Sequence, residues 1–132
     1  MFFQNKKRNT RSGALVVKAA YAMLIHDTEV FGRMSPFLVV KVGRQAQQTA
    51  VRQRGGRNPQ WNDEELHFNV VNEQKVHLTV YDHERFKKEH DLVGEASYDL
   101  ADIPDGDSDA VIEILYKGRL AGSVKVVFEF NN

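Results

Sequence analysis

Several residue types and motifs are scarce or missing in this chain of 132 residues, which has no cysteine, three prolines and one tryptophan. The lack of cysteine excludes a disulfide scaffold, a thiolate metal site and a cysteine nucleophile. It fits a reducing compartment, so a cytoplasmic location is expected. No apolar run approaches the roughly 18 residues of a membrane-spanning helix, and the basic start is not followed by the apolar stretch of a signal peptide. Length and composition are those of one globular domain with a single core.

Motifs of the common enzyme classes are also missing. The chain has no Gly-x-Ser-x-Gly and no His-Glu-x-x-His, and Gly55-Gly56-Arg57 is not followed by the Lys-Ser/Thr of a phosphate-binding loop. His67 and His77 lie within predicted strands, where a structural histidine is the ordinary explanation. We therefore predict that the protein is not an enzyme.

The charges balance over the chain but not along it. Residues 1–60 hold eleven Lys and Arg against two acidic residues, a net charge of +9, and residues 61–132 carry −9. The neutral total argues against nucleic acid as a partner. The uneven distribution predicts a positive surface only if the fold keeps the two halves apart, and a sandwich can also interleave them.

Short apolar segments recur along the chain between turn-forming residues. Alternation of apolar and polar residues, as at Val124, Val126, Phe128 and Phe130, is typical of antiparallel strands with one solvated face. Eight strands are predicted, at Ala14–Ala20, Pro36–Val42, Thr49–Arg52, Glu65–Val70, Lys75–Tyr81, Gly94–Tyr98, Val111–Tyr116 and Gly122–Phe130. One helical turn is expected near Leu100–Ile103. The pattern predicts an all-β sandwich or barrel.

The first residues differ from the rest in composition. Residues 1–12 are polar and basic with two phenylalanines, so we expect a flexible basic arm followed by a single domain over residues 13–132.

Acidic residues gather in two predicted loops, His26–Ser35 and Asp82–Asp91. Calcium needs six to eight oxygen ligands, which acidic side chains spaced along a curling loop can supply. Acids in such loops also serve as turn formers and solubilising groups. The histidines in the same loops match no zinc-binding spacing.

Five segments in order resemble the C2 domain, the membrane- and calcium-binding module of protein kinase C and synaptotagmin. They are Gly13–Val17, Gly32–Val39, Arg57–Asp63, Val80–Glu84 and Asp91–Gly94. The similarity covers about residues 13–130. It implies an all-β, eight-stranded antiparallel β-sandwich with its binding loops at one end, in the family's permuted second topology.

The resemblance also implies a set of calcium ligands. Ser35 stands where the family usually has an aspartate, so one strong ligand is missing. Glu29 has the usual spacing from Ser35, whereas Asp27 would need an insertion. The candidate ligands are Asp27, Glu29, Asp82, Glu84 and Asp91. Two outcomes stay open: one weak calcium site, or loops that have lost calcium and kept their shape.

Two further groups of residues correspond to lipid-binding features of similar domains. Basic residues on or beside the second and third predicted strands suit phosphate groups; they are Lys41, Arg44, Arg52, Arg54 and Arg57. Phe31 and Phe86 are apolar residues in otherwise charged loops, where similar domains insert side chains into the bilayer interface. The alternatives are a solvated strand face and, for Phe31, a cap on the sandwich end.

We therefore expect a peripheral membrane-binding module that recognises anionic phospholipid through a basic strand face and two end loops, with weak or absent calcium dependence. The alternative is a calcium-independent protein-docking or scaffold module that has lost lipid binding and attaches a protein partner.

Overall fold

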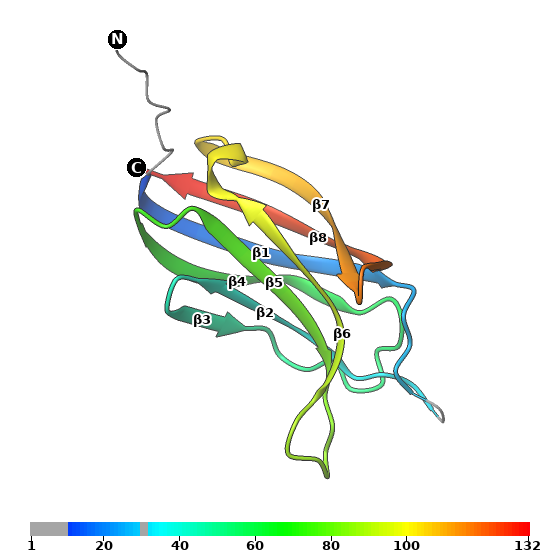
Figure 1. The fold of residues 1–132 in the computed structure, drawn as a ribbon. Helices are drawn as coiled ribbons and strands as arrows, with labels where there is room; N and C mark the ends of the chain where they lie inside the picture. Colours follow the sequence, from blue (N-terminus) through cyan, green and yellow to red (C-terminus); the bar gives the residue numbers. More distant parts are fainter. Residues whose placement is uncertain (1–10, 30–31) are drawn as a thin grey trace.

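The computed structural model describes residues 11–29 and 32–132, and over this part of the chain it shows eight antiparallel strands and one short 3-10 helix (Figure 1). The strands are β1 (Ser12–Leu24), β2 (Pro36–Val42), β3 (Gln45–Gln48), β4 (Gln60–Val71), β5 (Lys75–Asp82), β6 (Asp91–Asp99), β7 (Gly106–Tyr116) and β8 (Arg119–Asn131), and the helix η1 is Leu100–Asp102. The predicted all-β fold is confirmed, and so is the helical turn. No helix among the described residues is long and apolar enough to cross a membrane.

Hydrogen bonding places the strands in the order β3-β2-β5-β6-β7-β8-β1-β4. Only the pair Glu95 and Leu115 joins β6 to β7, so the strands divide into two four-stranded layers that separate beyond this point (Figure 1). The assignment of this order to the permuted second topology stays a prediction.

Alternation along the strands builds the core between the layers. On β8, Val124, Val126, Phe128 and Phe130 are at most 1% exposed, whereas the residues between them are partly exposed. Trp61 is also buried in this core. Burial of large apolar side chains on both inner faces stabilises the sandwich by roughly 1.5–3 kcal/mol for each one.

The antiparallel connections place four turns or loops at one end of the sandwich, which we call the loop end. We name residues 25–35 loop one, residues 49–59 loop two and residues 83–90 loop three; the fourth is the β7–β8 turn at Lys117 and Gly118. The described turns at residues 43–44 and 72–74 and the segment with η1 lie at the opposite end (Figure 1).

One predicted strand is misplaced. Thr49–Arg52 is part of loop two, and the third strand is Gln45–Gln48. This strand lies at the sheet edge and exposes most of its side chains, so it lacks the apolar signal on which the prediction relied. Thr49 is buried although it belongs to a loop, and its hydroxyl accepts a hydrogen bond from Leu38 N.

The predicted basic arm lies mostly outside the described residues. Arg11 is described, and its guanidinium donates to the Leu100 carbonyl at 2.6 Å and to the Ile103 carbonyl. It also pairs with Asp105 at 2.8 Å. These bonds attach the start of β1 to the segment between β6 and β7.

Candidate functional site

Four carboxylates converge at the loop end. Asp82 ends β5 and is paired with Asp91 at the start of β6, Glu84 follows two residues after Asp82, and Glu29 comes from loop one. One oxygen atom from each of the four can be chosen so that all lie within 4.8 Å of one another. We call these four residues the acidic cluster.

Asp82 holds the cluster to loop one. Its side chain is 1% exposed, and its two carboxylate oxygens accept hydrogen bonds from Ser35 N at 2.7 Å and from the Thr28 hydroxyl at 2.8 Å. The Ser35 carbonyl in turn accepts from His83 N at 2.9 Å. Because bonds to a charged acceptor are stronger than neutral ones, Asp82 positions loop one against β5.

Crowding of the carboxylates changes their protonation. A hydrogen bond to Asp82, partial burial and the charges of Asp82 and Glu84 raise the pKa of Glu29 from 4.5 to about 7. A hydrogen bond to Asp91, followed by burial and the charge of Asp91, raises the pKa of Glu84. Without a cation the cluster therefore keeps a proton near neutral pH that a bound cation would displace.

The spacing of the cluster fits calcium. Calcium lies about 2.3–2.6 Å from its oxygen ligands, so ligands around one ion are at most about 5 Å apart. The 4.8 Å spread meets this limit. Oxygen is also the ligand type that calcium prefers, so Glu29, Asp82, Glu84 and Asp91 could hold one ion, with water completing its coordination.

Two loop-one residues that bear on the predicted ligand set lie outside this cluster. Asp27 accepts from Glu29 N at 3.0 Å, and its other oxygen is 3.4 Å from Arg57 Nε. The Ser35 hydroxyl accepts from Arg54 N at 3.0 Å. The structure thus brings together four residues of the predicted set, Glu29, Asp82, Glu84 and Asp91. Asp27 and Ser35 instead connect loop one to loop two.

The five predicted lipid-binding cations do not share one strand face. Arg52, Arg54 and Arg57 belong to loop two, because the third strand ends before them. Lys41 lies on β2, five residues or roughly 17 Å from Pro36, the residue of β2 at the loop end. Arg44 follows β2 in the turn at the opposite end of the sandwich.

Loop three carries the most exposed large apolar side chain among the described residues. Phe86 is 93% exposed, whereas the other predicted loop phenylalanine, Phe31, lies outside the described residues. The cations beside it were not singled out from the sequence, although their adjacency was visible; they are Arg85, Lys87 and Lys88. Lys87 Nζ lies 3.6 Å from an oxygen of Asp91.

Aromatic and imidazole rings support the base of loop three. The His83 and His90 rings are 4.8 Å apart, and the His90 ring lies 5.1 Å from that of Phe37 on β2. His90 Nδ1 also accepts a hydrogen bond from Glu84 N at 3.0 Å. The base of the loop is therefore packed on the sheet, while Phe86 extends beyond it.

Comparison with known proteins identifies the fold family. The family model described as "C2 domain" matches residues 13–115. The chain belongs to the C2 domain family. The predicted resemblance is confirmed.

The curated relatives of this C2 domain are longer than the chain itself. It is 31% identical over 122 residues to ingression protein fic1 of Schizosaccharomyces pombe, a match that covers 89% of this chain and 44% of fic1. It is 41% identical over 66 residues to Protein C2-DOMAIN ABA-RELATED 4 of Arabidopsis thaliana, covering 49% of this chain and 36% of that protein. The chain spans less than half the length of these curated relatives.

Solved structures agree on the fold. A C2 domain of plant Extended Synaptotagmin 1 superimposes with a TM-score of 0.80 at 23% identity, over 94% of this chain and 97% of that one. The calcium-bound tandem C2 domains of Extended-Synaptotagmin 2 give a TM-score of 0.74 at 18% identity, over 89% of this chain and 45% of that one.

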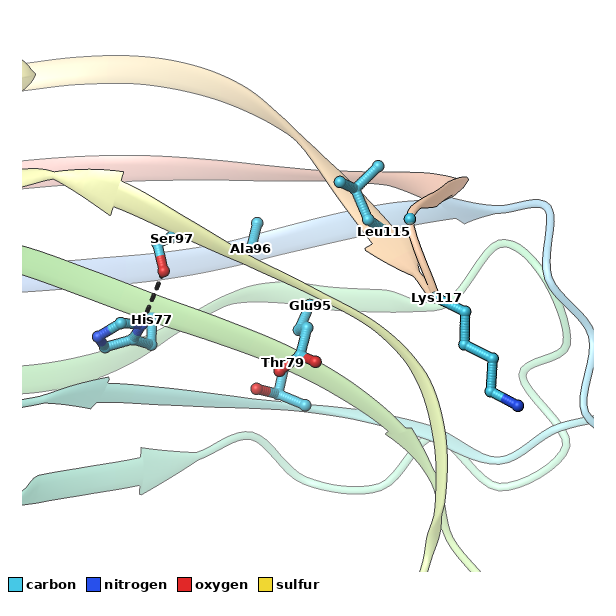
Figure 2. A pocket seen from close by; sticks show the side chains of 8 residues that line it. His77, Thr79, Glu95, Ala96, Ser97, Leu115 and Lys117 are labelled. Carbon is cyan, nitrogen blue, oxygen red and sulfur yellow. Dashed lines mark hydrogen bonds between the residues drawn. The ribbon is translucent and has the colours of Figure 1, made fainter.

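A polar groove of about 420 Å³ crosses the outer face of β5 and β6 in this C2 domain. Figure 2 shows the His77–Ser97 hydrogen bond, which is 2.8 Å long, with Thr79 and Glu95 further along the two strands. Leu115 and Lys117 border the groove from the end of β7 (Figure 2). Its lining carries single charges of opposite sign rather than a cluster.

Proposed function

We propose that this C2 domain is a cytoplasmic, peripheral membrane-binding module whose loop end contacts anionic phospholipid, assisted weakly by one calcium ion. The observation that carries the proposal is the exposed Phe86 beside the acidic cluster and among the loop-three cations. An apolar anchor and a charge-dependent contact at one end of a domain are the two signals that reversible membrane attachment requires.

Phe86 supplies the apolar signal. Its 93% exposure in the free protein means that nearly the whole ring would leave water on entering the interface. Such a transfer contributes about 2 kcal/mol. Cations near an anionic surface add about 1 kcal/mol each, so Arg85 and Lys88 beside the ring strengthen the contact.

Calcium would act by reversing the local charge. The acidic cluster repels an anionic membrane, and a bound divalent cation removes that repulsion and offers open positions to lipid oxygens. Ser35 has no carboxylate to offer as a ligand, and its hydroxyl is hydrogen-bonded to loop two. We therefore propose that one calcium ion binds and that it increases membrane binding modestly.

Loop two supplies the basic contribution in place of the strand face. Arg52 Nε donates to the Gln60 carbonyl at 2.7 Å and Arg57 lies beside Asp27, so both guanidiniums have partners in the described structure. Arg54 is exposed at the same end of the sandwich. We therefore propose that Arg54 contacts lipid and that Lys41 and Arg44 contribute little.

Co-sedimentation with phosphatidylserine-containing vesicles tests the proposal. Phe86→Ala should lower the bound fraction, whereas Val71→Ala, which truncates a 63% exposed residue near the opposite end, should leave it unchanged. Equal binding of the two variants would contradict the proposal. No binding by the unaltered protein would favour the alternative, calcium-independent protein docking, for which the edge of β7 over residues 106–114 is a candidate because this stretch is not paired with β6.

A further inference from the structure

A second groove opens at the loop end, between loop one and the β7–β8 turn. It has a volume of about 490 Å³ and is lined by His26, Tyr116, Lys117, Arg119 and Leu120. None of its lining residues belongs to the acidic cluster, and a neighbouring depression that shares His26 and Tyr116 extends from it to Asp91.

The floor of this groove is held from both layers. His26 Nδ1 lies 2.8 Å from the Val93 carbonyl, so that nitrogen donates its proton to β6. The centre of the same ring is 4.1 Å from that of Tyr116 on β7. The backbone of Ile25 and His26 donates to the Ala121 carbonyl at 2.7 and 3.1 Å. The groove is therefore preformed.

Two cations at the groove, Lys117 and Arg119, have no acidic partner in the described part of the chain. Among the described residues, no carboxylate lies within 4.0 Å of Lys117 or Arg119, whereas Arg57 and Lys87 at the same end are each paired. Figure 2 shows the Lys117 side chain extending away from Glu95, the acid that shares the neighbouring groove. Both positive charges are thus available to an anion.

The backbone at Lys117 is unfavourable for a lysine. Lys117 and Gly118 have φ angles of 50° and 79° in a two-residue hairpin turn. Such turns favour Asn, Asp or Gly at the first position, because other side chains are strained there. Lys117 Nζ lies 5.3 Å from the centre of the Tyr116 ring and has no acidic partner among the described residues. A strained residue that carries such a charge to the rim of a groove points to a role outside folding.

Apolar side chains lie next to these cations. Leu120 lines the groove and is 49% exposed, and Ile25, which is 57% exposed, precedes the groove residue His26 in loop one. A ligand that suits both features carries a phosphate for the two cations and hydrocarbon for the apolar rim. A phospholipid has this chemistry.

We propose that the groove between loop one and the β7–β8 turn binds the headgroup phosphate of an anionic membrane phospholipid through Lys117 and Arg119, with Leu120 in the hydrocarbon boundary. The proposal rests on the membrane-binding function above and adds a second contact beside loop three. Together with the contacts of loops two and three, this groove would bring both layers of the sandwich to the bilayer.

Vesicle binding by charge variants tests the cations. Lys117→Asn combined with Arg119→Gln keeps a turn-compatible residue and removes two charges, and it should lower the affinity for phosphatidylserine vesicles by roughly 25-fold, about five-fold for each cation. The matched control is Lys75→Gln with Lys125→Gln, which loses the same charge away from the loop end and should bind within about two-fold of the unaltered protein. Equal affinities of the two double variants would overturn the proposal.

Site-specific labelling provides an independent readout, because the chain has no cysteine of its own. An environment-sensitive fluorophore on Leu120→Cys should report transfer to an apolar environment when vesicles are added, and the same fluorophore on Val71→Cys should not. If Phe86→Ala weakens vesicle binding while the label at position 120 stays in water, the membrane function stands and the groove proposal fails. A response to soluble glycerophosphoserine equal to that for vesicles would also overturn it, because the site would then bind free phosphate groups without the membrane.

Discussion

Replacement of Asp82 by alanine tests the interpretation that this carboxylate organises the loop end. The variant removes the acceptors for Ser35 N and the Thr28 hydroxyl, at 2.7 and 2.8 Å. Hydrogen bonds to a charged group contribute about 1.5–3 kcal/mol each. Relief of repulsion within the acidic cluster returns roughly 1 kcal/mol. We therefore expect a net loss of about 2–5 kcal/mol in the free energy of unfolding.

Urea denaturation in the presence of a chelator measures this loss, with fluorescence of the single, buried Trp61 as the signal. Glu84→Gln is the matched control, because it also removes a carboxyl group from the acidic cluster, and the neighbours of Glu84 raise the pKa of that group. This control should be as stable as the unaltered protein or more so. Equal stability of Asp82→Ala and Glu84→Gln would contradict an organising role for the Asp82 hydrogen bonds, since Asp82 would then act only through its charge.

Three further predictions follow from other parts of the structure. The pKa of Glu29 is about 7 in the folded protein, against an ordinary value of 4.5. The stability that protonated Glu29 contributes is therefore complete below about pH 4.5 and is lost as the pH rises through 7. Thermal unfolding in chelator should show a melting temperature that falls over this pH range, and Glu29→Gln should make the melting temperature less dependent on pH. Gly94→Ala should lower the free energy of unfolding, measured by denaturation, by about 1–3 kcal/mol. The added Cβ would lie 2.9 Å from Ala121 Cβ and 3.0 Å from Ile114 Cδ1. Unchanged stability would mean that the two layers can move apart at this position. The side-chain amide of Gln45 forms hydrogen bonds with both the backbone N–H and the carbonyl of Asn69 at the β4 edge. Gln45→Ala leaves these two backbone groups open to another strand and should raise the aggregation rate measured by light scattering. A rate equal to that of the unaltered protein would show that this edge is protected in another way.

Strands with an apolar period were predictable from the sequence, and those without one were not. Pro36–Val42 matches β2 at both ends because its inward residues are apolar and a turn follows. Gln45–Gln48 has three glutamines and one alanine, and its pairing with β2 depends on backbone bonds that leave no trace in side-chain pattern. Because the third strand was predicted at Thr49–Arg52, Arg52 was expected on a sheet face, whereas it lies in loop two.

The candidate site was predictable to the level of loops. The resemblance to C2 domains was enough to indicate Asp82 and Asp91, and the structure brings these two residues together because the ends of β5 and β6 are paired. Spacing alone could not separate Glu29 from Asp27. That choice depends on the path of loop one, which is determined by the bonds of Asp27 to Glu29 N and Arg57. The groove at Lys117 joins residues about ninety positions apart and had no signal in the sequence.

Binding of the unaltered protein to vesicles with and without phosphatidylserine, each in calcium and in chelator, tests the membrane-binding account most directly. We expect sedimentation with the anionic vesicles, a modest increase with calcium and little binding to neutral vesicles. Equal binding to anionic and neutral vesicles, or none to either, would contradict it.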